Sequence, residues 1–456
     1  MTDVVQADAV VIGAGCAGLA AAVRLSASGA KVVVVEQAPR LGGRTTSFVD
    51  KESGERLDNG QHVLFGCYRE TYELLRQIGT ADLAPLQSSL ALTIAGGRDG
   101  RGHVLSCPDL PSPWHLLLGL LMWDAVPVLD RLSVRHLSHV LSSARRDGAA
   151  ATAAKVDASL TVAQWLAAQQ QTTQMRRWLW DPLVFAALNQ SPDEAAARPF
   201  VHVLAEMFGP RAEDSAVGLP RVPLDELIAL PAVRFIESHG GTVLMKRPAT
   251  IAMSGDRMTH VRVGETSIHA RSVISAVPWH ALPALWDEHC PPVLAEVAAN
   301  VAAMKSAPIV TVSLWFDRDV MPRECPFVGL SDGTMHWFFG REAITGTGTH
   351  VSAVASGAVD ILRLENDDVI ARAETDARRA LPGTRGAKLL RALVVREPRA
   401  TFSLAPDAPP RPSTVTPLAG FFLAGDWTDT GLPATIEGAI RSGNAAATAV
   451  TAAKDT

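Results

Sequence analysis

The fold is decided by one stretch near the start of the chain, Ala9-Val10-Val11-Ile12-Gly13-Ala14-Gly15-Cys16-Ala17-Gly18. A short apolar strand runs directly into a Gly-x-Gly-x-x-Gly motif. A helical pattern over 17–28 follows, and a second apolar strand over 31–35 ends at Glu36. A strand, glycine loop, helix and strand in this order, with an acid about twenty residues on, are typical of a βαβ unit that binds a dinucleotide.

Each glycine of the motif has its own structural role. Gly13 makes the tight turn, Gly15 lets the backbone reach a pyrophosphate, and Gly18 lets helix and strand pack closely. The acid at the end of the second strand would accept hydrogen bonds from a ribose. The predicted nucleotide-binding set from this unit is Gly13, Ala14, Gly15, Ala17, Gly18, Glu36 and Gln37.

A glycine-rich loop follows the second strand directly, with the sequence Pro39-Arg40-Leu41-Gly42-Gly43-Arg44. Here the chain resembles the amine oxidase and phytoene desaturase group of FAD enzymes, which carry a Gly-Gly-Arg at this place. The resemblance implies that the backbone of Gly43 and the guanidinium of Arg44 lie on the FAD. The sequence contains one Gly-x-Gly-x-x-Gly motif, which argues against a stably bound nicotinamide. Because no nicotinamide site is predicted, the sequence does not identify the electron donor that reduces the flavin.

The C-terminal region predicts a second side of the cofactor site. An apolar strand over 421–424 stops at Gly425-Asp426, and a helix begins near Thr435. The free N–H groups and positive dipole end of this helix form an anion site, which suits the negative pyrimidine edge of a reduced flavin. Small residues over 438–443 would admit a bulky group. The predicted contacts are Gly425, Asp426 at the ribityl and diphosphate region, Thr435, the backbone of Ile436 and Glu437, and Ala439.

The same resemblance implies three further cofactor contacts in the middle of the chain. The segment Asp58-Asn59-Gly60-Gln61-His62 would run along the flavin face, with Gly60, Gln61 and His62 near the ring. The segment 240–249 would lie beside the adenine, with Ala249 in place of the usual Val. The segment 272–279, which includes Ala276, would cover the adenosine.

These motifs predict an α/β fold (α+β overall) in which a Rossmann-type FAD-binding domain is interleaved with a substrate domain of helices and a mixed sheet. Residues 1–80, 206–290 and 416–456 are assigned to the FAD-binding domain. Residues 81–205 and 291–415 are assigned to the substrate-binding domain.

The two parts of the predicted substrate domain differ in pattern. Residues 81–205 lack strand alternation and are predicted to be mostly helical, with a polar surface connection at 144–155. The later part contains alternating apolar residues. Its predicted strands are 309–316, 335–339, 350–355 and 389–396.

Composition excludes several classes of protein. The net charge of −5 provides no basic field for nucleic acid. The five cysteines are scattered without a C-x-x-C pair, so neither a metal site nor a disulfide framework is predicted, and a reducing cytoplasm fits. The two tyrosines, Tyr68 and Tyr72, lie on one early helix and cannot build the cage that amine oxidation commonly uses. Ten tryptophans and an apolar helix instead suggest a long hydrocarbon substrate.

The apolar helix lies in the segment 114–129, which is too short and too often interrupted by polar residues to span a bilayer. Its centre, 116–123, is apolar on every face. The segment is either a buried core helix or a helix in the membrane interface at the mouth of a lipid tunnel. In the second alternative, the protein is cytoplasmic and also makes peripheral contact with the inner face of a membrane.

Four longer stretches carry a closer resemblance: 58–68, 178–192, 219–227 and 424–443. Together they are similar to the hydroxysqualene dehydroxylase family, the squalene-associated FAD enzymes of bacterial hopanoid pathways. The resemblance implies that hydroxysqualene, a hydrophobic triterpene alcohol, loses its allylic hydroxyl as water and receives a hydride from reduced flavin N5. A phytoene-type desaturase and a flavin-bearing lipid carrier without turnover are the alternatives.

This chemistry needs one acid, and the sequence leaves four candidates open: His62, Asp181, Asn189 acting through a water, and His336. Each has a structural alternative. A lone histidine such as His62 is often only hydrogen-bonded in place. Asp181 could be a helix N-cap, Asn189 could simply end a helix, and His336 could face solvent from a strand.

Overall fold

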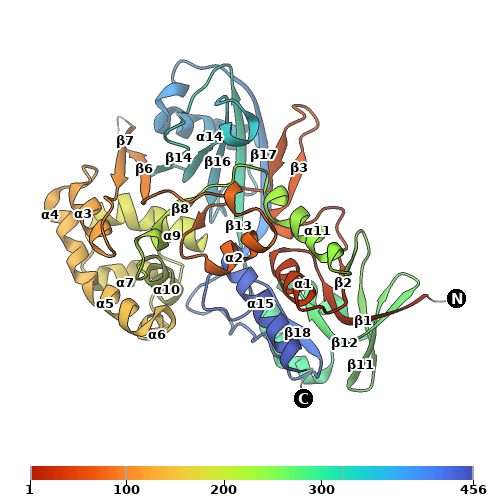
Figure 1. Ribbon diagram of the computed structural model, residues 1–456. Coiled ribbons are helices and arrows are strands. Elements are labelled where there is room, and N and C mark those ends of the chain that lie inside the picture. Colours follow the sequence, from red (N-terminus) through yellow and green to blue (C-terminus); the bar gives the residue numbers. More distant parts are fainter. Residues whose placement is uncertain (1–2, 98–99, 322, 454–456) are drawn as a thin grey trace.

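The computed structural model describes residues 3–97, 100–321 and 323–453. Two seven-stranded sheets, each with its own helical cover, organise these residues (Figure 1). A group of helices lies beside the second sheet. The predicted α/β fold is confirmed.

The first sheet has the strand order β10-β11-β12-β1-β2-β9, and β18 pairs with β12. Its bounds are β1 (Asp3–Ile12), β2 (Val32–Val35), β9 (Thr242–Leu244), β10 (Thr250–Ser254), β11 (Arg257–Val263), β12 (Thr266–Ser275) and β18 (Phe421–Leu423). The central strands are parallel, with β1 between β12 and β2. All four valines of β2 are buried, as expected for a strand covered on both faces.

Three helices cover one face of this sheet: α1 (Cys16–Ala27), α11 (Leu230–Ser238) and α15 (Ile436–Ala452) (Figure 1). α1 and α15 touch through their backbones, since an ideal Cβ on Gly443 would lie 2.1 Å from the Ala17 carbonyl oxygen. The Ser442 hydroxyl accepts a hydrogen bond from the Gly425 N–H at 2.7 Å. These two small residues therefore pack α15 against its neighbours, where we had expected room for a bulky group.

The second sheet has the order β17-β13-β16-β15-β14-β6-β7. Its bounds are β6 (Ala91–Gly96), β7 (Arg101–Ser106), β13 (Ser306–Phe316), β14 (Phe327–Leu330), β15 (Trp337–Gly340), β16 (His350–Ser356) and β17 (Leu389–Phe402). Alternate residues of β13 pack against α14 (Asn366–Ala380), which covers one face (Figure 1). The intervening residues include the buried Thr311 and Ser313, so the other face of β13 is partly polar.

The helical group contains α3 (Trp114–Met122), α4 (Val128–Arg131), α5 (Ser138–Asp147), α6 (Ala149–Ala154), α7 (Val162–Ala168), α8 (Thr173–Met175), α9 (Asp181–Leu188) and α10 (Ala197–Met207). Two expectations are corrected here. The segment 81–205 is not purely helical, because β6 and β7 belong to it. The segment 144–155 is not a connection but the ends of α5 and α6, separated by Gly148 with φ of +83°.

The remaining helices and strands lie outside the two large sheets and the helical group. They are β3 (Ser47–Val49), β4 (Arg56–Asp58), β5 (Leu64–Phe65), α2 (Arg69–Gln77), β8 (Val217–Gly218), α12 (Ala295–Ala303) and α13 (Glu342–Thr345). β3 and β4 form an antiparallel hairpin. Its residues reach the second sheet through side chains described below.

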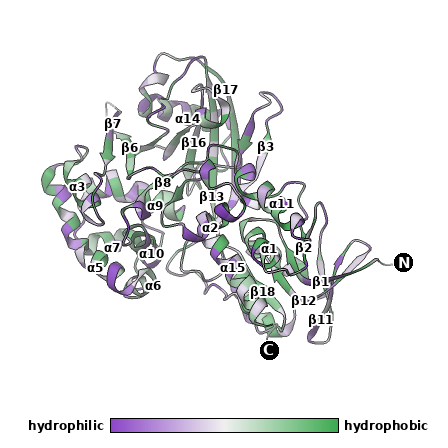
Figure 2. Ribbon diagram, in the orientation of Figure 1, coloured by the Kyte–Doolittle hydropathy of each residue, from purple (hydrophilic) through white to green (hydrophobic). Residues whose placement is uncertain are grey.

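α3 lies at the edge of the molecule and is mainly hydrophobic (Figure 2). It is not a buried core helix, since Trp114 is 63 % exposed and Met122 is 70 % exposed. Its other face packs closely on the end of β7, where an ideal Cβ on Gly119 would lie 2.8 Å from the Cys107 sulfur. None of the helices that the structure describes has the length and apolar character needed to cross a membrane.

Candidate active site

The Gly13–Gly18 loop between β1 and α1 packs against backbone on two sides. Gly13 has φ of +110°, and an ideal Cβ there would lie 2.7 Å from the Ala276 carbonyl oxygen. An ideal Cβ on Gly18 would lie only 1.9 Å from the Gly13 carbonyl oxygen. Both positions therefore exclude any side chain. The Ala14 carbonyl in turn accepts a hydrogen bond from the Gly42 N–H at 2.9 Å, which joins this loop to the one after β2.

Beside these contacts, the backbone at Gly15 and Gly43 is accessible. The nearest atom to an ideal Cβ on Gly15 is a carbonyl oxygen 4.0 Å away, and Gly43 is exposed with φ of +59°. Within the described residues, α1 begins without a side-chain cap and without an acid in its first turn. Two glycine loops beside an uncapped helix N-terminus fit the diphosphate of a dinucleotide.

Glu36 follows β2 and is 9 % exposed. One carboxylate oxygen accepts the Ala14 N–H at 2.8 Å, and the other accepts the Ala38 N–H at 2.7 Å. Each oxygen keeps a lone pair for a ribose hydroxyl. The Glu36 carbonyl accepts the Arg247 N–H at 2.9 Å, which brings the segment containing Ala249 to the same place. The neighbouring Gln37 is exposed.

Arg44 and Asp426 form an ion pair that joins the two ends of the chain. The guanidinium Nη2 lies 2.5 Å from Asp426 Oδ1, and Nη1 donates to the Ala400 carbonyl at 2.8 Å. Burial lowers the pKa of Arg44, but the Asp426 carboxylate outweighs it and leaves the pKa raised. Both residues were predicted to contact FAD, and in the structure each already binds the other.

The N-terminus of α15 uses side chains and backbone differently. Thr435 is the N-cap, and its hydroxyl accepts the Gly438 N–H at 2.9 Å. The fully buried Glu437 carboxylate points to α2, where it accepts the Thr71 N–H at 2.9 Å and the Thr71 hydroxyl at 2.7 Å. Arg441 pairs with it at 2.8 Å. Only the backbone of the first turn, beginning at Ile436, is therefore available to a ligand, while the partly buried Ala439 packs in the apolar cluster around α1.

His62 lies on the irregular segment after β4. Gly60 has φ of +137°, and its carbonyl lies 3.2 Å from His62 Nδ1. Burial lowers the pKa of His62, Asp58 and the Gly60 hydrogen bond raise it by less, and Arg44 lowers it further. The ring is therefore neutral at neutral pH. With Nδ1–H donating to the carbonyl, Nε2 carries a lone pair and is a hydrogen-bond acceptor.

His336 precedes β15, and its ring is stacked on Phe185 with 4.1 Å between centroids rather than turned to solvent. The Ser356 N–H donates to Nδ1 at 3.0 Å, which places the ring proton on Nε2. Burial lowers the pKa of His336 to about 4.

Asp181 lies inside a continuous helix that runs from α8 through a π-helical turn (Arg176–Trp180) into α9. The alternative that Asp181 is an N-cap is therefore wrong, because the preceding residue, Trp180, is already helical. One carboxylate oxygen lies 3.6 Å from Arg176 Nε. Burial raises the pKa of Asp181, and Arg176 opposes this shift.

Asn189 ends α9 in the left-handed conformation, with φ of +53°. Its amide donates to the Ala307 carbonyl at 3.1 Å and to the Thr401 hydroxyl at 3.0 Å, and it accepts the Gly357 N–H at 2.7 Å. Both amide hydrogens are engaged. His336 and Asn189 thus bind consecutive N–H groups at the end of β16, whereas His62 lies on the segment after β4.

The profile of the family described as flavin containing amine oxidoreductase matches residues 16–451. The chain belongs to this family. It is an FAD-dependent oxidoreductase, and the glycine loops, Glu36 and the uncapped N-terminus of α1 are the residues that fit its cofactor.

Individual members of this flavoenzyme family align over almost the whole chain. Hydroxysqualene dehydroxylase from Sinorhizobium fredii is 28 % identical over 459 residues, covering 96 % of this chain and 96 % of that protein. Zeta-carotene desaturase from Zea mays is 25 % identical over 474 residues, covering 95 % of this chain and 81 % of that protein. The solved structure of cyclohexylamine oxidase from Brevibacterium oxydans has a TM-score of 0.70 at 18 % identity, covers 99 % of this chain and 100 % of its own, and shows the shared fold.

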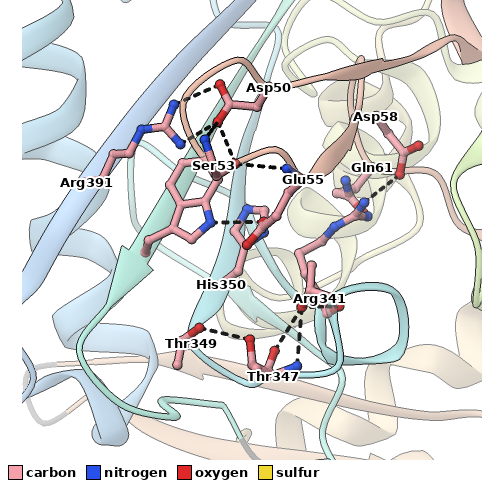
Figure 3. Close-up of polar contacts among 12 residues, drawn as sticks. Asp50, Ser53, Glu55, Asp58, Gln61, Arg341, Thr347, Thr349, His350 and Arg391 are labelled. Carbon is pink, nitrogen blue, oxygen red and sulfur yellow. Dashed lines mark hydrogen bonds and ion pairs between the residues drawn. The ribbon is translucent and has the colours of Figure 1, made fainter.

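One residue of this flavoenzyme site escaped the sequence analysis. Arg341, which is 3 % exposed, follows β15 and reaches the segment after β4 (Figure 3). Its Nη2 lies 2.9 Å from Asp58 Oδ2, and its Nη1 donates to Gln61 Oε1. A charged residue at the end of the buried Trp-Phe-Phe-Gly strand was the available signal.

A second buried polar cluster ties the β3–β4 hairpin to the same sheet (Figure 3). Asp50 pairs with Arg391 at 2.7 Å, and the Arg391 guanidinium lies 4.5 Å from the Trp315 ring. The other side of Trp315 stacks on His350 at 4.3 Å. Glu55 lies 3.0 Å from Trp315 Nε1 and 3.0 Å from His350 Nδ1. Burial, with Arg341 and Arg391 nearby, lowers the pKa of His350 to about 3.

Proposed function

We propose that this enzyme reduces hydroxysqualene to squalene by replacing the allylic hydroxyl with hydrogen. The observation that carries the proposal is the share of each relative's length that aligns with this chain. The proteins named hydroxysqualene dehydroxylase match this chain over 96–98 % of their own length at 27–28 % identity. Zeta-carotene desaturases leave about a fifth of their length unmatched at somewhat lower identity. A FAD-dependent desaturase of the phytoene type is the second candidate, because those matches are also nearly complete on this chain.

When reduced, FAD supplies the hydride. The chain's own residues hold that cofactor between the Gly13–Gly18 loop, Glu36 and the Arg44–Asp426 pair. For the substrate, they must enclose a long hydrocarbon, bind one hydroxyl group and exclude water, since water would recapture an allylic cation. The apolar clusters beside both sheets and the buried polar side chains on β13 are the surroundings that support this proposal.

The proton that accompanies loss of the hydroxyl has four candidate sources: Asp181, His336, a water held by Asn189, and His62 once it is protonated at Nε2. We expect at least one single substitution among them to lower turnover by more than about tenfold while flavin absorbance is retained. Near-normal turnover in all four variants would show that the proton comes from elsewhere.

The reaction is tested by mixing hydroxysqualene anaerobically with chemically reduced enzyme. The proposal expects reoxidation of the flavin and formation of squalene. Failure to reoxidise, together with reduction of the oxidised enzyme by a less conjugated polyene such as phytoene, would instead establish the desaturase. Flavin that reacts with neither compound would favour a carrier without turnover.

We also propose that the outer face of α3 and α4 contacts the cytoplasmic surface of a membrane, from which so apolar a substrate would be taken. Fifteen large apolar side chains of the described residues are exposed, and eight of them lie between 110 and 132. These eight are Leu110, Trp114, Leu118, Leu121, Met122, Val128, Leu129 and Leu132. So dense an apolar surface is typical of membrane or protein contact.

Flotation with liposomes tests this contact. We expect wild type to float with the vesicles and the Leu121→Glu, Leu129→Glu variant to remain in the soluble fraction. A matched control is Leu390→Glu, since Leu390 is 60 % exposed on the distant β17. Wild type that stays wholly soluble, or identical behaviour of the two variants, would contradict the proposed contact.

A further inference from the structure

The buried guanidinium of Arg341 needs an explanation beyond packing. A charged side chain that is 3 % exposed is costly unless it is paired and hydrogen-bonded. Its main chain is fixed as well, because the Arg341 N–H donates to the His350 carbonyl at 3.1 Å. The side chain therefore projects from a rigid part of the second sheet.

Asp58 fixes the guanidinium from the opposite side. Asp58 Oδ2 pairs with Arg341, while Oδ1 accepts the Ser47 hydroxyl at 2.7 Å and the Leu224 N–H at 2.9 Å. Because hydrogen bonds from two segments and an ion pair from a third hold this carboxylate, its orientation is fixed. The ion pair thus has one geometry, and Gln61 is the third member of the group (Figure 3).

This arrangement selects one orientation of the Gln61 amide. A glutamine side chain can exchange its oxygen and nitrogen by a half turn, and its neighbours decide which is presented. Here Oε1 accepts from the Arg341 guanidinium, so Nε2 faces away from it. Among the described residues, Nε2 has no hydrogen-bond partner and is not buried. The cation on the oxygen side also polarises the amide and strengthens its N–H donors.

The next residue offers the complementary group. His62 uses Nδ1–H on the Gly60 carbonyl, which leaves Nε2 as an acceptor. His62 lies close to the cofactor loops, since Arg44 contributes to its electrostatics. Gly60, which precedes both residues, lies close to the polar face of β13, where the Thr311 hydroxyl is 3.8 Å from an ideal Cβ on Gly60. A donor and an acceptor on consecutive residues suit an alcohol, which both accepts and donates a hydrogen bond.

We propose that Gln61 and His62 bind the hydroxyl group of an otherwise hydrocarbon substrate, and that Arg341 and Asp58 are the residues that position Gln61. This inference rests on the proposed function and adds the chemical feature by which an alcohol is distinguished from the corresponding hydrocarbon. The oxygen of the alcohol accepts from Gln61 Nε2–H, and its O–H donates to His62 Nε2. No bond is made or broken in this binding step.

The test compares the affinities of the FAD-loaded enzyme for a polyprenyl alcohol, geranylgeraniol, and for squalene. Wild type should prefer the alcohol. Gln61→Met removes the amide at nearly constant size and should weaken alcohol binding by about tenfold, with squalene binding unchanged. Arg341→Met should cause the same selective loss, and Arg341→Lys should retain part of the preference. Gln77→Met, at the exposed end of α2, is the matched control and should behave as wild type.

Two results would overturn the proposal. The first is an unchanged ratio of the two affinities in Gln61→Met with a normal FAD content. The second is a wild type that does not distinguish the alcohol from squalene. Because Gln61 is only partly buried, its variant keeps the test decisive even where Arg341→Met fails to fold. Failure of the proposed reaction is recognised separately, by the absence of squalene in the anaerobic reoxidation experiment.

Discussion

Two polar regions hold this molecule together, and they are built in opposite ways. Around the glycine loops, backbone atoms meet backbone atoms or a nearby carboxylate, and the Glu36–Ala14 contact spans 22 residues of sequence. Between the β3–β4 hairpin and the second sheet, buried side chains meet in ion pairs, and the Arg391–Asp50 contact spans 341 residues. The first region is sensitive to added atoms. The second is sensitive to removed charges.

The largest effect is expected from removing the buried cation of the second region. Arg341→Met leaves Asp58 buried beside no counter-charge, and we expect the free energy of unfolding to fall by about 3–5 kcal/mol. Urea unfolding followed by circular dichroism measures it. The double variant Arg341→Met, Asp58→Asn should regain part of the loss, because no unpaired charge remains. Equal losses in the single and double variants would show that the charge is not the cause.

We expect a single added methyl group to disrupt the packing of the first region. Gly18→Ala places a Cβ against the Gly13 carbonyl oxygen, so loop and helix must separate. We expect a loss of about 3 kcal/mol in stability and a protein purified without flavin absorbance. Gly386→Ala is the matched control, since an ideal Cβ on Gly386 meets no atom within 4 Å. A Gly18→Ala protein with a full complement of FAD would contradict the close packing of this loop.

This contrast explains how much could be predicted from the sequence. The βαβ unit and its binding residues depend mainly on local order, since Gly18 packs on the Gly13 carbonyl oxygen and Glu36 accepts the Ala14 N–H. The contact between Gly13 and Ala276 is the exception. The α/β fold followed from that stretch. The strands β6 and β7 were missed because they are joined by glycines and complete a sheet whose other strands come two hundred residues later.

The positions of charged side chains could not be predicted for the same reason. Arg341, Arg391 and His350 lie on strands or loops whose pattern specifies burial but not the partner. Their partners lie on the β3–β4 hairpin. The two strands of this hairpin are close to each other in the sequence but far from the strands that they contact. Likewise, the prediction for Glu437 concerned only its backbone, and nothing in the local sequence shows that its carboxylate caps α2.

An intermediate effect is expected from acid, and in the second region it comes from His350. The pKa of His350 is about 3 in the folded protein and near 6.5 when exposed, so the unfolded chain binds the extra proton between these values. Stability is therefore lost as the pH falls below 6.5. From pH 6.5 to 4.5, this residue accounts for about 2–3 kcal/mol. His350→Phe keeps the stack on Trp315 and should unfold with a correspondingly weaker pH dependence in urea. An unchanged dependence would mean that other buried histidines cause it.

The smallest effect is expected at Arg44 and Asp426, which combine features of both regions. The pair joins side chains 382 residues apart, yet it lies beside the glycine loops. If the pair acts as one neutral unit toward FAD, Arg44→Met and Asp426→Asn should each weaken FAD binding by about tenfold. The double variant should then be no worse than either single variant, because the loss of one partner already disorders the other. Losses that multiply in the double variant would mean that each residue binds the cofactor independently, as the family resemblance alone would suggest. Titration of the apoprotein with FAD, followed by flavin fluorescence, distinguishes the two, and Arg411→Met provides a control for the loss of a nearby partly buried cation.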